Sequence, residues 1–262
     1  ATREMQVGET VPDSTTFLLT GMLVAVGAGV SAMAGFGFGI ALMPFMILLY
    51  PPKEAVVLTL LIAMCGVSIQ WFRVRQHTHY PLMARLVVGT LMGVPLGGYV
   101  LGVIEPGPLK ALIGIAVLVA AVLSLVRRSD VDLPPRMPST GLSLAAGFGA
   151  GILATTVGQP GITVASLMTW TRLDKQVVRA TLVSYFVLAD AGAMVAFYVQ
   201  GILTRELALT AFALIPFYLI GLFVGDWGFR HSGPVGYRRL VLGLLSVSAV
   251  LGLYSGLHAL IE

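Results

Sequence analysis

Long apolar runs with almost no charge follow one another along the 262-residue chain, and they constrain the fold more than any other feature. Apolar residues make up 57% of the sequence and charged residues only 11%, whereas a soluble domain carries about 25% charged residues. So little charge cannot coat a surface that faces water, and runs of this length can cross a lipid bilayer. The composition therefore predicts an all-α integral membrane protein embedded in the bilayer.

Several classes of site and partner are not expected from this sequence. Cys65 is the only cysteine, which rules out an internal disulfide and a CxxC motif. The basic residues behind the net charge of +4 lie in short loops, where they report orientation, so we predict no nucleic-acid partner. His77 and His79 have no further ligand nearby, so we predict no metal, and nothing indicates a cofactor. Residues 1–16 lack the cationic segment and cleavage site of a signal peptide.

The chain divides near its middle at residues 127–139, where a charged, proline-rich stretch separates two apolar halves. When the second half is shifted back by 122 residues without a gap, 11 of the 34 positions from 27 to 60 are identical. The matches include the pair Lys53 and Lys175 and a pair of threonines, which are harder to match by chance than glycine and alanine. This register predicts an internal repeat.

We expect residues 1–126 to form the first repeat, 127–139 a cytoplasmic linker and 140–262 the second repeat. The predicted elements are a hairpin at 17–50 with helices 55–72, 82–103 and 108–126, and a hairpin at 140–170 with helices 180–200, 207–226 and 237–261.

The first block of each half is too long for one membrane crossing and too short for two. Breaks at 35–39 and 155–161 leave about 11 residues, or about 16 Å of helix, after each break. Single kinked crossings would divide the 16 Lys and Arg residues 8 to 8 between the two faces, whereas hairpins that dip in and return divide them 12 to 4. Because cytoplasmic loops carry the excess of Lys and Arg, we favour re-entrant hairpins with both termini outside, in the periplasm. Three crossings after each hairpin then make the repeats inverted, which is a transporter plan.

Two hairpin tips that enter from opposite faces would bring the N-termini of two short helices together near the membrane midplane. Irregular backbone at that depth must be buried in protein or line a cavity, and the unbonded N–H groups of a helix N-terminus attract anions. The alternative is that the glycines only allow helices to pack closely. The predicted substrate-binding residues come from the tips and the helices beside them: Ser31, Gly35, Phe36, Gly37, Phe38, Gly39, Ile40, Thr59, Thr155, Thr156, Gly158, Gln159, Pro160, Gly161, Thr163, Thr181 and Tyr185.

Asp190 lies about halfway along an apolar helix, where a carboxyl group is energetically costly and is by default a functional candidate. It could carry a proton that couples transport to the proton gradient, or it could hold a structural hydrogen bond to a group such as Ser68, its partner at the 122-residue offset. Thr59 and Thr181 correspond to each other at the same offset, and each could face the site or bond its own helix backbone.

Two stretches resemble the TauE/SafE sulfite exporter family: a glycine-rich turn followed by a proline, GFGFGIALMP at 35–44, and SLMTWTRLDKQVVRATLVSY at 166–185. The resemblance covers nearly the whole chain. It implies a multi-spanning inner-membrane protein that exports, or in some members takes up, small sulfur-containing or organic anions such as sulfite and sulfonates. The helix after the first hairpin departs from the family because it has no Lys and no Asn, so the anion need not be the best-known one. The family's glycine turns fall here on Gly35, Gly37 and Gly39 with Pro44, and on Gly158, Pro160 and Gly161.

The sequence thus predicts a secondary transporter, in the first instance an exporter, of a small anion that binds near the midplane between the hairpin tips. An anion channel or a membrane-embedded subunit without transport activity is the alternative. An enzyme is not expected, because only four histidines exist and none forms a pair within an apolar run. Assembly as a homodimer stays open.

Overall fold

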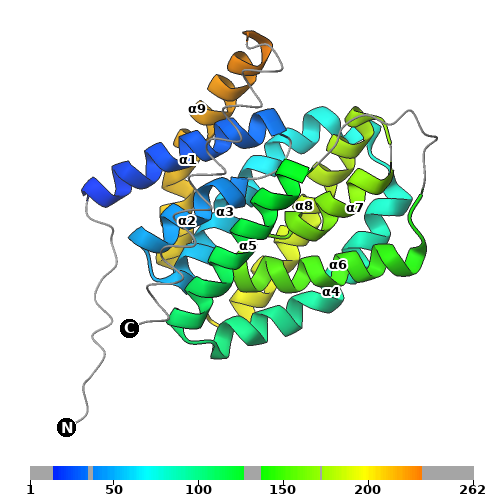
Figure 1. The fold of residues 1–262 in the computed structure, drawn as a ribbon. Coiled ribbons are helices and arrows are strands. Elements are labelled where there is room, and N and C mark those ends of the chain that lie inside the picture. The colour runs from blue at the N-terminus through cyan, green and yellow to red at the C-terminus, as the bar shows by residue number, and fades with distance from the viewer. Residues whose placement is uncertain (1–13, 35–37, 127–136, 172, 232–262) are drawn as a thin grey trace.

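The computed structural model describes residues 14–34, 38–126, 137–171 and 173–231, and this part of the chain is helical without any strand (Figure 1). The expected helix at 237–261 and most of the linker lie outside these residues. The elements in chain order are α1 (Ser14–Ala34), α2 (Phe38–Leu49), α3 (Pro52–Val74), the 3-10 turn η1 (Arg75–His77), α4 (Tyr80–Val103), α5 (Pro106–Val126), α6 (Thr140–Val157), α7 (Gly161–Thr171), α8 (Lys175–Val199) and α9 (Arg205–His231).

Six of the described helices, namely α1, α3, α4, α6, α8 and α9, are long and apolar enough to cross a membrane. Large apolar side chains are exposed on their outer faces, for example Phe212 at 74% and Val199 at 78%, as expected for surfaces that contact lipid. The helix α2 has 12 residues and α7 has 11, so they rise only about 18 and 16 Å. The prediction of an all-α, multi-pass membrane protein is confirmed.

Most helices begin at polar or proline residues that precede the apolar runs, which is why they start up to five residues earlier than predicted. The side chains of Ser139 and Asp174 accept hydrogen bonds from backbone N–H groups in the first turns of α6 and α8, and His79 does the same for α4. Pro52 opens α3 at a position where the missing N–H would have had no helical partner. Hydropathy does not detect these caps, because they are not apolar.

The helices α4 and α6 pack along each other with their backbones in direct contact (Figure 1). Glycines make this approach possible: a Cβ atom at Gly93 would overlap the carbonyl oxygen of Phe148, and one at Gly151 would overlap that of Thr90. Gly89 and Gly147 meet the facing backbone in the same way. Small residues four positions apart are the usual device for close helix contact in membranes.

The helices α1 and α9 form a second contact of the same kind. A Cβ atom at Gly225 would overlap the backbone of Gly29, and one at Gly221 would overlap that of Ala25. At the 122-residue offset Gly29 corresponds to Gly151, so α1 corresponds to α6, and α9 follows in its half as α4 does in the other. In this sequence register each glycine-mediated pair joins one helix from each half of the chain, and α3, which packs against α8, has α8 as its counterpart.

Each short helix lies alongside the long helix that precedes it. A Cβ atom at Gly27 in α1 would sit 3.6 Å from the Cβ of Leu42 in α2. In the second half, a Cβ atom at Gly149 in α6 would sit 3.5 Å from Cγ2 of Thr163 in α7. Each contact joins a residue of a long helix to a residue of the short helix that follows it, α1 to α2 and α6 to α7.

The glycine contact between α4 and α6 yields a first prediction. Changing Gly93 to Ala should lower the stability by about 1–3 kcal/mol, because the added methyl group meets backbone that cannot rotate away. The matched control is Gly141→Ala in α6, where no atom lies within 4 Å of the new methyl group and no loss is expected. Unfolding midpoints in detergent, followed by circular dichroism, measure both, and equal midpoints would contradict the packing role.

Candidate functional site

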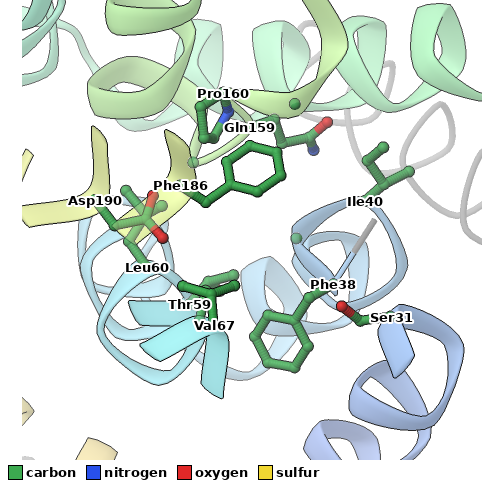
Figure 2. Close-up of a pocket in the computed structure, with 14 residues that line it drawn as sticks. Ser31, Phe38, Ile40, Thr59, Leu60, Val67, Gln159, Pro160, Phe186 and Asp190 are labelled. Carbon is green, nitrogen blue, oxygen red and sulfur yellow. The ribbon is translucent and has the colours of Figure 1, made fainter. Parts of the chain in front are cut away.

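A cavity lies among the end of α1, the start of α2, the residues that join α6 to α7, and the helices α3 and α8 (Figure 2). Its volume is about 60 Å³, several times the roughly 10–15 Å³ that one water molecule requires. The space therefore suits a solute of a few heavy atoms. The residues that line it are Ser31, Phe38, Gly39, Ile40, Thr59, Leu60, Ala63, Val67, Gly158, Gln159, Pro160, Gly161, Phe186 and Asp190.

The two breaks touch each other through their glycines. A Cβ atom at Gly39 would lie 2.8 Å from the carbonyl oxygen of Gly158, so only glycine fits at position 39 without displacing the backbone. Gly158 has φ of 71° and ends α6 with its N–H bonded to the carbonyl oxygens of Ala154 and Leu153. This left-handed conformation is one that glycine adopts readily.

The first turns of the two half-length helices lie at the cavity. Gly39 and Ile40 belong to the first turn of α2, and Pro160 and Gly161 lie at the start of α7. The leading N–H groups of a helix have no partner within it and carry the positive end of its dipole. Proline lacks the N–H and is well suited to this place. Two partial positive charges of backbone origin thus lie around one cavity.

Three polar side chains that line the cavity have buried atoms with no hydrogen-bond partner among the described residues. These atoms are Oγ1 of Thr59, both Nε2 and Oε1 of Gln159, and Oδ1 of Asp190. Each side chain is at most 2% exposed. A buried polar group without a partner costs about 1–3 kcal/mol, so these four atoms are available to bind water or a polar solute in the cavity.

Asp190 is the only ionisable group among the described residues that line the cavity. Figure 2 shows its side chain beside Phe186, on the side of the cavity opposite Ile40. Arg179 does not line the cavity; its Nη2 donates a 3.5 Å hydrogen bond to the carbonyl oxygen of Ala32, next to Ser31. The lining therefore offers hydrogen-bond donors and dipoles rather than cationic side chains.

Ten of the residues predicted from the sequence line the cavity, including Asp190. Gly35, Phe36 and Gly37 were predicted too and lie outside the described residues. The ten are Ser31, Phe38, Gly39, Ile40, Thr59, Gly158, Gln159, Pro160, Gly161 and Asp190.

Five predicted residues are not part of the lining and contact other elements. The hydroxyl of Thr155 donates to the Gly151 carbonyl at 2.9 Å, and that of Thr156 donates to the Gly97 carbonyl at 3.3 Å. Both bonds help to hold α6, the second of them against α4. Thr163 lies beside Gly149 in the contact between α7 and α6.

The other two, Thr181 and Tyr185, join α8 to the start and middle of α4. Oγ1 of Thr181 accepts a 3.0 Å hydrogen bond from the backbone N–H of His79, and the Tyr185 hydroxyl lies 2.8 Å from Oγ1 of Thr90. Thr59 has the place in the first half that Thr181 has in the second, yet Thr59 faces the cavity. The two equivalent threonines therefore have different surroundings.

The hydroxyl of Ser68, one structural partner considered for Asp190, donates to the carbonyl oxygen of Met64 at 2.7 Å. It thus bonds its own helix, as serine in membrane helices often does. Oδ1 of Asp190 remains without a partner among the described residues.

Sequence reasoning missed four lining residues, all apolar: Leu60, Ala63 and Val67 from α3, and Phe186 from α8. Their spacing contains the signal, because 60, 63 and 67 share one helix face and Phe186 lies one turn before Asp190. It also missed Tyr218 of α9, which lies behind the lining. The Tyr218 ring packs edge-on against Phe38 at 5.1 Å, and its hydroxyl accepts from Nε2 of Gln70 at 3.2 Å.

These features define a multi-pass membrane protein whose helical core holds a small cavity, mainly apolar in its lining, with a few buried polar side chains. The sequence pattern of the sulfite exporter TauE/SafE family matches residues 19–252. The chain therefore belongs to the TauE/SafE family, which is a family of membrane transporters. Comparison with curated proteins and with solved structures found no significant match.

The left-handed glycine at the end of α6 yields a second prediction. Changing Gly158 to Ala should destabilise the fold by more than the 1–2 kcal/mol that a left-handed alanine costs, because the new methyl group also overlaps Cε of Met43. The control is Gly201→Ala, which has φ of 69° but no atom within 4 Å of the methyl group and so isolates the backbone cost. Thermal unfolding of both variants in detergent measures how much stability each one loses. A loss no larger for Gly158→Ala than for Gly201→Ala would show that Met43 moves aside freely.

Proposed function

We propose that this chain is a secondary transporter that binds a small anion, such as sulfite or a sulfonate, in the cavity between the two breaks. The observation that carries this proposal is the set of unpartnered polar atoms on Thr59, Gln159 and Asp190, gathered at the first turns of two half-length helices. Membership of a transporter family supports movement of a solute rather than its chemical conversion.

The chemistry of the lining suits an oxyanion. Oxyanion oxygens accept hydrogen bonds, and the Gln159 amide and the Thr59 hydroxyl can both donate. The helix starts at Gly39 and Gly161 add N–H groups and partial positive charge. A site without a lysine or arginine in its lining can bind an anion and still release it, as transport requires.

We propose further that the two halves are inverted repeats whose hairpins enter the membrane from opposite faces. The paired contacts of α1 with α9 and of α4 with α6 support this arrangement, as do the matching Gly27–Leu42 and Gly149–Thr163 contacts. With hairpins, both termini lie in the periplasm and the basic linker in the cytoplasm of an inner membrane. Binding at the junction of two such repeats is how many secondary transporters alternate access.

Asp190 is the group that we propose for proton coupling. It is the one carboxyl group in the described lining, it is 2% exposed, and its Oδ1 has no partner. Because the buried carboxyl group lines the cavity, a proton can reach it through that space.

The experiment that tests the function is a flux assay with purified protein in proteoliposomes. We expect uptake of radiolabelled sulfite that saturates with concentration and exchanges against internal sulfite. Flux that does not saturate and follows only the membrane potential would identify an anion channel. A protein that moves no sulfite, sulfonate or related organic acid would be a membrane subunit without transport activity.

Gln159 provides a third prediction. Replacing it by Leu keeps the volume but removes two polar atoms from the cavity, and we expect sulfite affinity to fall at least about tenfold, the cost of one lost charge-assisted hydrogen bond. The control is Gln70→Leu, which removes another buried glutamine whose Oε1 has no partner but which lies outside the lining. The dissociation constant of sulfite, measured for both detergent-purified variants, tests this prediction. Equal losses in the two would place the anion elsewhere.

The equivalent threonines provide a fourth prediction. Thr59→Val should weaken sulfite binding with little change in stability, because Oγ1 of Thr59 has no partner in the protein. Thr181→Val should do the reverse, leaving binding intact and costing about 1 kcal/mol through the lost bond from His79. Binding and thermal stability are measured for both variants, and a loss of affinity in Thr181→Val alone would refute the assignment.

A further inference from the structure

We infer that the anion and a proton bind together in this cavity, with protonated Asp190 donating a hydrogen bond to the anion, so that the carrier moves the two in the same direction. This inference rests on the proposed function and adds the sign of the coupling: proton and solute are loaded together rather than exchanged. It follows from the position of the carboxyl group and from the charges around it.

Asp190 shares one small cavity with every group that we assign to the anion. The cavity measures about 60 Å³, and the side chains of Asp190, Gln159 and Thr59 all line it. Figure 2 shows these side chains around a common space. A solute held by Gln159 and the two helix starts therefore shares this cavity with the carboxyl group.

No cationic side chain among the described residues compensates a charge on Asp190. The helices packed against α8 include α6 and α7, which contain no charged residue, and α4, whose one charged residue is Arg85. In α3 the charged residues are Lys53, Glu54 and Arg73, at its two ends, and η1 carries Arg75 and His77. None of these lines the cavity.

The titratable side chains that interact electrostatically with Asp190 are the phenols of Tyr185, on the same helix, and of Tyr218, on α9. A phenol carries no positive charge in either protonation state. Arg179 is bound to the carbonyl oxygen of Ala32 and does not belong to the lining. The carboxyl group thus has no counter-ion in the described part of the site.

An anion and an ionised Asp190 would repel each other strongly in this space. At an effective dielectric constant of about 20, two negative charges about 6 Å apart weaken binding roughly 100-fold. A proton on Asp190 removes that repulsion and converts an acceptor into an O–H donor that an oxyanion can use. Because coupling between two ligands is reciprocal, the bound anion also strengthens proton binding by the same factor.

The test measures sulfite binding to detergent-purified protein over a series of pH values, with Asp190→Asn and Asp174→Asn as variants. For the wild type we expect the affinity to fall as the pH rises, by up to about tenfold per pH unit once Asp190 ionises in the unoccupied protein. Asn at position 190 carries a permanent N–H donor and no charge, so its affinity should stay flat, apart from the titration of sulfite itself, which is common to all three proteins. Asp174 is an exposed helix cap whose function Asn can replace, so that variant should follow the wild type.

A second measurement counts the protons. Titration calorimetry of wild-type protein with sulfite, in two buffers that differ in ionisation enthalpy, gives the protons taken up per anion. Above the pH at which the affinity begins to fall, we expect about one more proton for the wild type than for Asp190→Asn. Should that variant fail to fold, uptake of about one proton by the wild type, beyond the protons that sulfite itself binds at that pH, supports the inference by itself.

The possible failures can be told apart. Equal pH profiles in wild type and Asp190→Asn, with no difference in proton uptake, would overturn the joint binding and leave the anion site standing. No binding or flux of sulfite, a sulfonate or a related organic acid at any pH would overturn the proposed function and this inference with it. Binding of the zwitterion taurine that is tighter than that of sulfite and insensitive to pH would show an ionised Asp190 paired with the ammonium group, and would also overturn the inference.

Discussion

The contact between Gly39 and the carbonyl oxygen of Gly158 is the point on which the rest of the site depends. A backbone that leaves the helical path in hydrocarbon must be surrounded by protein or water, because lipid offers no hydrogen bonds. Here the start of α2 meets the residue that follows α6, and the cavity lies beside that contact. The contact thus joins the two halves of the chain at the cavity.

The long helices supply the frame that holds the breaks in contact. Backbone-to-backbone packing of α4 on α6, and of α1 on α9, needs glycine on both sides and leaves little room for adjustment. Since α1 and α6 are the helices that lead into the breaks, these two contacts fix where the chain turns. Polar side chains then supply further links. Thr156 joins α6 to α4, and Thr181 joins α8 to His79, the residue before α4. Neither threonine lines the cavity.

Much of this arrangement could be predicted from the sequence, because its cause is local. The sequence places a break at 155–161, and the structure narrows it to 158–160, since α6 continues to Val157. The length of the short helices and the lining by Gly39, Gln159 and Asp190 follow from the glycine and proline pattern and from a carboxyl group in an apolar run. The sequence could not tell which threonines face inward. Thr59 and Thr181 are equivalent by register, and only tertiary packing decides that one meets a cavity and the other a backbone N–H. The apolar lining escaped notice for a related reason, since Leu60 or Phe186 in an apolar helix has nothing that distinguishes it from lipid-facing neighbours.

The difference between Thr59 and Thr181 means that the cavity is not a symmetric chamber, although the two positions correspond in the sequence register. Asp190 has Ser68 at the corresponding position in the first half, and the Ser68 hydroxyl bonds its own helix instead. A bound solute would therefore meet a carboxyl group on one side and hydroxyl, amide, aromatic and aliphatic groups elsewhere. A solute whose two ends differ would be held in one orientation.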